Sequence, residues 1–340
     1  MENRRQFLKK LSAGALASLL YKWSWASASS DKFGEVLPMR TLTRDGQKVT
    51  AFCMGGHHLG RTDTDKEAER LAERSIEMGV RFYDNSRVYH RGKSEELMGR
   101  YLTPKYRDHI FMMTKSPAKT GLGARKHLDE SLRALKTDYV DLWQMHHISS
   151  PEDVDNRIKG GVVDAFLEAK EKGKARYIGF TGHHNPETHL YFLSFLEKQG
   201  IEMDTCQLPL NVCDPSFASF QKNVLPVLLE RKYGVIAMKT MAGGSIIGKR
   251  FDITPESLAT EDIPDVVKGA SISLEQLHQY VYSLPVSTLC SGCATMEHLE
   301  HNVGVLKNLK KLSQSEMEGL VRAAKPFAGN NVENYKHVLE

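Results

Sequence analysis

Cysteine is scarce in this sequence, and the five that occur are too scattered for a disulfide scaffold. One stretch, C-S-G-C, has the C-x-x-C spacing of redox or metal sites, but no second C-x-x-C accompanies it. For this pair the sequence leaves two interpretations open, a disulfide between Cys290 and Cys293 or a plain tight loop. The five cysteines are Cys53, Cys206, Cys213, Cys290 and Cys293.

Long apolar runs and charge of one sign are also lacking. The apolar stretch at residues 11–20 is far shorter than the about 20 residues that span a bilayer, so we expect no stable membrane anchor. Residues 1–28 hold five of the 46 Lys and Arg residues and one of the 42 Asp and Glu residues, which leaves 41 of each in the remainder. A chain this balanced gives no reason to expect a nucleic-acid or anionic-membrane partner.

The first 28 residues have the pattern of an export signal. A basic head with Arg4 and Arg5 precedes the short apolar stretch, and Ala26-Ser27-Ala28 is a small-x-small cleavage site. The stretch N-R-R-Q-F-L-K resembles the twin-arginine signal, whose translocon carries folded proteins. We therefore expect a signal peptide at 1–28, a periplasmic or otherwise exported protein, and a single domain at 29–340.

Past Pro38 the chain predicts a β-hairpin around Asp45-Gly46, followed by eight strand–helix units. The predicted strands are apolar and short, with residues 49–56, 81–86, 109–115, 140–147, 175–184, 203–211, 235–240 and 286–292. The predicted helices are amphipathic, with residues 65–79, 92–102, 124–136, 156–173, 186–200, 217–234, 273–284 and 296–312.

This alternation predicts the α/β class and a closed (β/α)₈ TIM barrel with an N-terminal β-hairpin. A doubly wound sheet is the competitor, but no G-x-G-x-x-G opens the first helix. The longest connection, roughly residues 241–270, follows the seventh strand and has the length of a lid or binding loop.

The ends of the predicted strands carry titratable side chains, where the active sites of such barrels lie. Three strands in succession end in Asp84, Lys115 and His146. A carboxylate and an ammonium are expensive to bury unless they are paired. These three residues together therefore indicate a functional site.

Four stretches, in order, resemble the aldo-keto reductase family: RFYDNSRVYHRGKSEELMGRYL, HIFMMTKSP, DYVDLWQMHH and the closing SGCATMEHLEHN. The resemblance extends from the hairpin to the last helix and implies the family's barrel, a nicotinamide cofactor and hydride transfer to or from a carbonyl. Carried over residue by residue, it assigns the catalytic roles to Asp84, Tyr89, Lys115 and His146. We expect Tyr89 as general acid and base, Lys115 lowering the pKa of Tyr89, Asp84 holding Lys115, and His146 orienting the substrate oxygen.

The resemblance also implies a set of cofactor contacts along the later strands. Gln207 matches the glutamine for the carboxamide, MAGGSIIGK the loop over the pyrophosphate, and SGCATMEHLEHN the phosphate and adenine segment. The full expected set is Thr181, Gln207, Met238, Met241, Gly243, Gly244, Lys249, Ser291, Gly292, His298 and Asn302.

Three positions depart from the family pattern. Thr181-Gly182 replaces a Ser-Asn pair, Met238 replaces the aromatic residue that stacks on the nicotinamide, and Ala294 replaces the basic residue for the 2′-phosphate. Losing an arginine at a phosphate removes a bidentate contact. This loss weakens the preference for NADP(H), which remains the first choice of cofactor, with NAD(H) close behind.

Substrate identity is less constrained by the sequence. The expected substrate residues are His57, His58, Trp143 and His183. Histidine and tryptophan at a barrel mouth suit a small polar carbonyl or alcohol, such as a sugar, better than a steroid.

Two alternative functions stay open. The first is a metal-dependent barrel hydrolase, in which histidines from the pairs His57-His58, His146-His147 and His183-His184 would converge on a metal ion. Such hydrolases usually show H-x-H on the first strand, which C-M-G-G-H-H lacks, and adjacent residues on a strand point to opposite faces. At most one of each pair is then expected to face inward, and no metal site is predicted. The other alternative is a non-catalytic dinucleotide-binding barrel, against which the retained tetrad argues.

The expected export signal also bears on how tightly the cofactor is bound. A periplasm has no replenished pool of reduced nicotinamide, so a dissociating cofactor would be lost after one turnover. Export in the folded state allows the protein to load its dinucleotide first. We therefore expect a tightly held cofactor, recycled in place, and the twin-arginine translocon as a partner during export.

Overall fold

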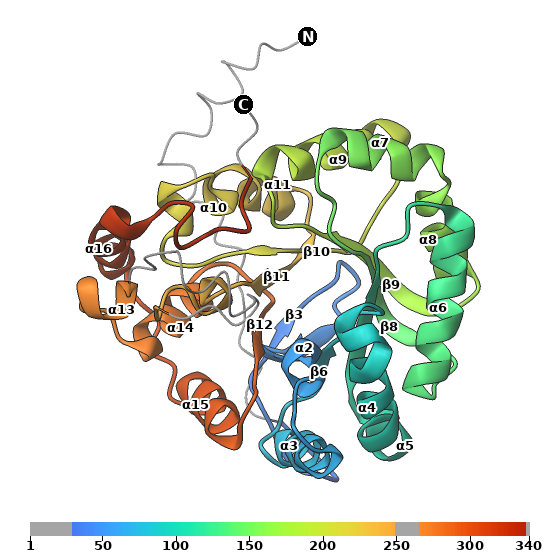
Figure 1. Ribbon diagram of the computed structural model, residues 1–340, viewed down its shortest axis with the longest axis horizontal. Coiled ribbons are helices and arrows are strands. Elements are labelled where there is room, and N and C mark those ends of the chain that lie inside the picture. The colour runs from blue at the N-terminus through green and yellow to red at the C-terminus, as the bar shows by residue number, and fades with distance from the viewer. Residues whose placement is uncertain (1–28, 249–264, 338–340) are drawn as a thin grey trace.

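Eight parallel strands close into a barrel in the computed structural model, which describes residues 29–248 and 265–337 (Figure 1). The strands are hydrogen-bonded in the order β10-β11-β12-β5-β6-β7-β8-β9, and β9 pairs with β10 to complete the ring. They are β5 (Phe52–Gly55), β6 (Phe82–Asp84), β7 (Phe111–Ser116), β8 (Val140–Met145), β9 (Ala175–Thr181), β10 (Thr205–Pro209), β11 (Gly234–Met238) and β12 (Thr288–Gly292). The predicted (β/α)₈ barrel is confirmed.

Helices surround the barrel on its outside (Figure 1). The longer ones are α3 (Asp65–Glu77), α4 (Lys93–Tyr101), α6 (Gly121–Leu135), α7 (Pro151–Lys159), α8 (Val162–Glu171), α9 (Pro186–Gln199), α14 (Leu274–Ser283), α15 (Met296–Lys307) and α16 (Gln314–Ala324). The shorter ones are α2 (Gly56–Leu59), α5 (Thr103–Tyr106), α10 (Phe220–Asn223), α11 (Leu225–Glu230) and α13 (Val266–Gly269). Across the described ranges, none of these helices has the length and apolar character needed to cross a membrane.

Local sequence explains where these helices begin and end. Thr64 and Glu67 form a capping box at the start of α3, and Gly79 follows its end with φ +91°. Two predicted helices are each split. Gly160-Gly161 separates α7 from α8, with Gly161 at φ +75°, and Pro226 lies in the first turn of α11, after the break from α10.

Two β-hairpins precede the barrel. The predicted one, β3 (Met39–Thr41) with β4 (Lys48–Thr50), is antiparallel and turns at Gly46, whose φ is +91°. The other, β1 (Ser29–Asp31) with β2 (Gly34–Val36), was not predicted. Leu42 and Val49 of the predicted hairpin belong to the apolar cluster inside the barrel. This hairpin therefore closes the amino-terminal end of the barrel and leaves the carboxyl end for the site.

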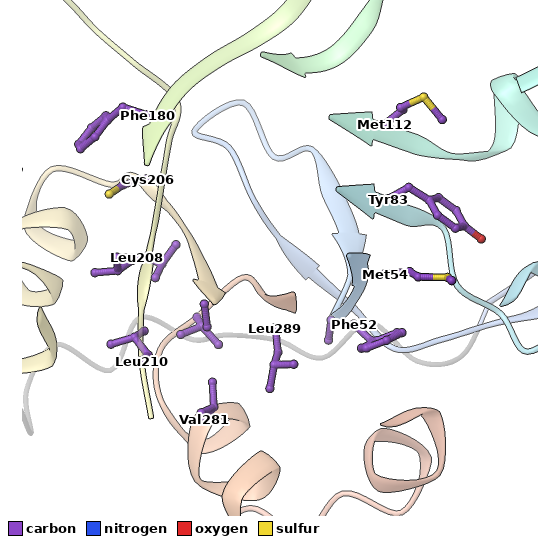
Figure 2. Close-up of a cluster of buried hydrophobic side chains, with 14 of the residues drawn as sticks. Phe52, Met54, Tyr83, Met112, Phe180, Cys206, Leu208, Leu210, Val281 and Leu289 are labelled. Atoms are coloured by element: carbon purple, nitrogen blue, oxygen red, sulfur yellow. The ribbon is translucent and has the colours of Figure 1, made fainter. Parts of the chain in front are cut away.

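The core has an inner and an outer layer, because successive side chains of a strand face opposite sides. The inner cluster fills the barrel and includes Cys53, Phe82, Met113, Leu142 and Ile236. The outer layer lies between strands and helices. Figure 2 shows part of it, with Leu289 of β12 and Val281 of α14 on facing elements.

Candidate active site

Every second residue of a strand faces the barrel interior, and this alternation places the polar residues of the site directly above the inner apolar cluster, called the apolar plug below. Asp84 lies two residues after Phe82, and Lys115 two residues after Met113, so each faces the barrel interior like its predecessor. The same parity carries from Leu142 to His146 just past the end of β8. One layer of titratable groups thus lies at the carboxyl end of the barrel.

Asp84 and Lys115 form a buried ion pair. Their exposed fractions are 3% and 1%, and the Lys115 Nζ donates to Asp84 Oδ1 and, at 2.8 Å, to the Asn85 carbonyl. Burial acts to lower the pKa of Lys115, but the attraction to Asp84 and Tyr89 outweighs it and raises that pKa. Lys115 is therefore a permanent cation beneath the site.

Tyr89 opens the 3₁₀ helix η1 (Tyr89–Gly92), which follows β6, and its phenol oxygen lies 3.1 Å from Lys115 Nζ. Burial raises the pKa of Tyr89 to about 12, and the Lys115 charge only partly opposes that rise. Lys115 lowers the pKa of Tyr89, as expected, but burial has the larger effect, because removal from water destabilises the phenolate more than one nearby ammonium stabilises it. The phenol is a proton donor at neutral pH.

His146 lies opposite, with its ring centroid 5.8 Å from that of Tyr89 in an edge-to-face arrangement. Its Nδ1 is 2.9 Å from the Ser86 hydroxyl, a partner that the sequence analysis did not identify. Burial and the Lys115 charge lower the pKa of His146 well below its usual value, so the imidazole is neutral. With Nδ1 engaged by Ser86, Nε2 is left for another partner.

Gln207 of β10 connects the ion pair to the expected nicotinamide position. Its Nε2 donates to Asp84 Oδ2 at 3.3 Å, while its Oε1 is buried without a hydrogen-bond partner among the described residues. An orphaned buried acceptor fits the amide group of a nicotinamide carboxamide. Beside it, Thr181 Oγ1 is 3.8 Å from the sulfur of half-buried Met238.

The start of the loop after β11 has the backbone that a close approach requires. Gly243 and Gly244 have φ of +68° and +98°, conformations that favour glycine, and Met241 packs against the core. These features fit a pyrophosphate lying against the main chain. Lys249, the other expected residue of this loop, lies outside the described residues.

The segment after β12 is the last part of the expected cofactor site. Ser291 and Gly292 are half-buried at the strand end, and a Cβ on Gly292 would lie 1.7 Å from His58 Nδ1. Gly292 is therefore needed for the His58 ring to lie against the strand. His298 is exposed in the first turn of α15, whereas Asn302 is 6% exposed and donates to Cys293 Sγ at 3.4 Å.

Comparison with known proteins decides the family. The model of the Aldo/keto reductase family matches residues 51–325. The chain belongs to this family. It is similar to the uncharacterized oxidoreductase YqkF of Bacillus subtilis, with 25% identity over 309 residues, 83% of this chain and 94% of that protein. It is also similar to L-galactose dehydrogenase of Arabidopsis thaliana, with 24% identity over 313 residues, 85% of this chain and 96% of that protein.

The chain shares its fold with solved structures of the family. An aldo-keto reductase from Klebsiella pneumoniae in complex with NADPH superposes with a TM-score of 0.65 at 20% identity. The match covers 84% of this chain and 95% of that one. The NADPH belongs to the Klebsiella protein, and the shared property is the barrel.

Three of the four expected substrate residues lie at the carboxyl end of the reductase barrel. The His57 ring is 5.1 Å from that of Tyr89, His58 lies on Gly292, and His183 follows β9. The prediction for Trp143 is wrong. That side chain is 1% exposed and stacks on Phe166 of α8 with ring centroids 3.7 Å apart. Trp143 has the opposite parity to inward-facing Leu142, so it lies in the outer core layer.

The histidine pairs do not alternate as predicted. His57 and His58 lie on α2, and His183 and His184 lie past the end of β9, so strand alternation does not apply to them. The rings of His183 and His184 both contact that of His147, at 4.5 and 4.3 Å between centroids. Burial lowers the pKa of all three imidazoles. The pKa of His147 falls below its usual value, that of His183 falls well below it, and that of His184 falls to about 4.

The C-terminal segment brings further groups to the same end of the barrel. Tyr335 Oη donates to Glu333 and the His337 ring stacks on His184 at 3.9 Å. The segment is fixed by Lys336, which is buried and bonds Asp214 at 2.7 Å. The sequence of this segment has no helical or strand periodicity. The one feature that could have indicated its place at the site is the close spacing of an acid, a tyrosine and a lysine, Glu333, Tyr335 and Lys336.

Proposed function

We propose that this protein is an exported NAD(P)-dependent oxidoreductase that transfers hydride between a nicotinamide and a small polar carbonyl or alcohol. One observation carries the proposal: Lys115 lies between Asp84 and Tyr89, 3.1 Å from the phenol oxygen. The NADPH of the Klebsiella protein and the family membership support the cofactor class. The name of the Arabidopsis relative, L-galactose dehydrogenase, supports a sugar-like substrate.

The residues present account for the proton chemistry. A bound nicotinamide supplies the hydride that reaches the carbonyl carbon. Tyr89 gives its phenolic proton to the carbonyl oxygen, and Lys115 stabilises the phenolate that is left. His146 donates from Nε2 to the same oxygen and orients it, provided that the Ser86 hydroxyl donates to Nδ1. In the reverse direction Tyr89 recovers the proton from the alcohol.

The Gln207 amide, Thr181 and the two glycines after β11 are the residues that we expect to hold the dinucleotide. Gln207 has an additional role, because the same side chain contacts Asp84 and presents a free buried oxygen. It thereby fixes the nicotinamide position relative to the ion pair. Ala294 stands where the family carries a basic residue for the 2′-phosphate, which leaves NAD(H) close behind NADP(H) as the cofactor.

Export is the second part of the proposal. The pattern of residues 1–28, which lie outside the described residues, supports passage through the twin-arginine translocon into the periplasm. A protein exported after folding retains its dinucleotide and uses it over successive turnovers, oxidising one substrate and reducing the next. Epimerisation of one substrate through a keto intermediate is the same chemistry applied twice.

Nucleotide analysis of protein purified from the periplasm tests the proposal. The protein is denatured and the released nucleotide is identified by mass spectrometry, with one equivalent of NADP(H) or NAD(H) expected per chain. An Arg4→Lys and Arg5→Lys variant is expected to stay in the cytoplasm with the same nucleotide bound. An empty site with activity only on added NADPH would contradict retention, and no binding of either dinucleotide would contradict the reductase itself.

A further inference from the structure

Three histidines outside the catalytic tetrad converge at the carboxyl end of the barrel. Within the described residues, His147, His183 and His184 each offer a ring nitrogen, and these atoms lie within 4.8 Å of one another. The closest pair is His147 Nε2 and His184 Nε2, 2.8 Å apart. The rings of His147 and His183 are stacked, with an interplanar angle of 21°.

We propose that His147, His183 and His184 bind one divalent first-row transition metal ion, with Zn²⁺ as the reference case. Imidazole is a ligand suited to Zn²⁺, Cu²⁺, Ni²⁺ and Co²⁺, and three histidines alone make a complete protein ligand set for an open Zn²⁺ site. Zn–N bonds of about 2.0–2.1 Å place ligand nitrogens about 3.3 Å apart in a tetrahedron. The closest separation here, 2.8 Å, is shorter than that value, and the upper limit of 4.8 Å for the three atoms is longer.

The groups behind the histidines suit ligands. The His183 Nδ1 lies 3.4 Å from the Tyr335 carbonyl oxygen, which leaves Nε2 for an ion. His184 is held on two sides, because its carbonyl accepts from the His337 amide at 2.7 Å and its ring stacks on that of His337. Metal-bound histidines commonly donate their second ring nitrogen to such a carbonyl, which fixes the ring and its tautomer, and His183 has this arrangement.

The backbone at His147 supports a role for its side chain. His147 has φ +57°, in the left-handed region that non-glycine residues rarely adopt. Residues held in this region cluster at active sites and ligand sites. Glycine would relieve the backbone strain but would also remove the imidazole. The turn directs the imidazole of His147 to the loop after β9.

Neighbouring charges shape what the site binds. Arg157 donates to the His147 carbonyl at 3.1 Å, and Lys119 and Arg157 both pair with Asp153. This carboxylate offsets part of the positive charge beside the histidines. The fourth metal position is left for an oxygen ligand, either water or an oxygen of a polar substrate held next to His146. The site does not depend on the proposed reductase function, and its test reads metal binding rather than turnover.

The competing explanation is an N–H···N hydrogen bond between His147 and His184 with no ion. The full-length chain is purified without a histidine tag, stripped of metal with a chelator and titrated with Zn²⁺. This titration distinguishes a metal site from a hydrogen bond without an ion. In competition with a chromophoric chelator we expect one equivalent bound per chain. Co²⁺ in place of Zn²⁺ is expected to show the visible absorption of a tetrahedral complex.

Variants locate the ion. His183→Ala and His184→Ala are expected to lower the affinity by more than the about 10–100-fold that loss of an outer partner costs. His301→Gln, at an exposed position of α15, is the matched control and keeps full binding. Zn²⁺ should also raise the Tm of the wild type and of His301→Gln but not of His183→Ala, which reports binding to folded protein. Absence of stoichiometric binding, or unchanged binding by the double variant His183→Ala/His184→Ala, would overturn the proposal.

Discussion

The ammonium nitrogen of Lys115 lies 3.1 Å from the phenol oxygen of Tyr89 and bonds Asp84 on its other side. This arrangement holds a fixed positive charge next to the group that exchanges a proton with the substrate. Because the charge is buried, the protein environment and not solvent determines how far it stabilises the phenolate. The predictions below follow from this pair and from the residues around it.

The pH dependence of Tyr89 is set by the raised pKa, about 12. The phenol keeps its proton where an ordinary tyrosine, with a pKa of about 10, has begun to lose it. The kcat/KM for reduction is therefore expected to stay level through pH about 10, whereas that for oxidation rises with pH. An ultraviolet difference titration of wild type against Tyr89→Phe checks the same point. A phenolate signal from Tyr89 with a midpoint at or below pH about 10 would contradict it.

Breaking the buried ion pair is expected to destabilise the fold. Lys115→Met leaves the Asp84 carboxylate buried and unpaired, a change that costs about 3–5 kcal/mol in the free energy of unfolding. The double variant Lys115→Met/Asp84→Asn should recover a large part of that loss. Denaturant unfolding measures both, with Lys172→Met as control, since its pair with Glu168 is exposed to solvent and contributes little to stability. Equal losses in the single and double variants would argue against the pair.

Ser86 is expected to act as a positioning residue for His146. Ser86→Ala removes the 2.9 Å hydrogen bond to Nδ1, so the imidazole no longer has a fixed tautomer. A hydrogen bond of about 0.5–1.5 kcal/mol corresponds to a loss in kcat of about 2- to 12-fold, with dinucleotide affinity unchanged. Ser75→Ala removes another buried serine hydroxyl, which bonds Tyr83, and should lower stability only. A loss of affinity instead of kcat in Ser86→Ala would show that its role is structural.

Trp143 is expected to affect stability and not substrate binding. Its ring fills the layer between β8 and α8, so Trp143→Ala should lower the free energy of unfolding by about 3–5 kcal/mol. Trp143→Phe keeps part of the packing and allows kinetics to be measured, with the substrate KM unchanged. A changed KM in Trp143→Phe at wild-type stability would return this residue to the substrate site.

The barrel and the tetrad positions follow from sequence because each depends on a local pattern. Eight apolar strands alternate with amphipathic helices, and Asp84 and Lys115 end strands with the parity of the apolar plug. The prediction that Trp143 contacts substrate failed because successive residues of a strand face opposite sides. Trp143 is one residue from inward-facing Leu142 and therefore faces the helices.

Other features depend on contacts between distant segments. His147 meets His184 across 37 residues, and His183 meets Tyr335 across 152, separations that no periodicity reports. The pKa of Tyr89 also required the structure, because the sequence names its charged neighbour but not how much water surrounds it. Likewise, nothing in the sequence around Ser86 indicates that its hydroxyl faces His146.

A single-turnover experiment with Tyr89→Phe tests the central claim most directly. The wild type and the variant are loaded with reduced nicotinamide dinucleotide and mixed with a panel of small polar carbonyls, including sugars, and the nicotinamide absorbance is followed. The account predicts dinucleotide binding by both proteins and a rate of oxidation about 10²- to 10⁴-fold lower in the variant, the usual contribution of a general acid. Tyr191→Phe, at an exposed tyrosine that bonds Asp155, should match the wild type. Equal rates in the wild type and Tyr89→Phe would contradict the account.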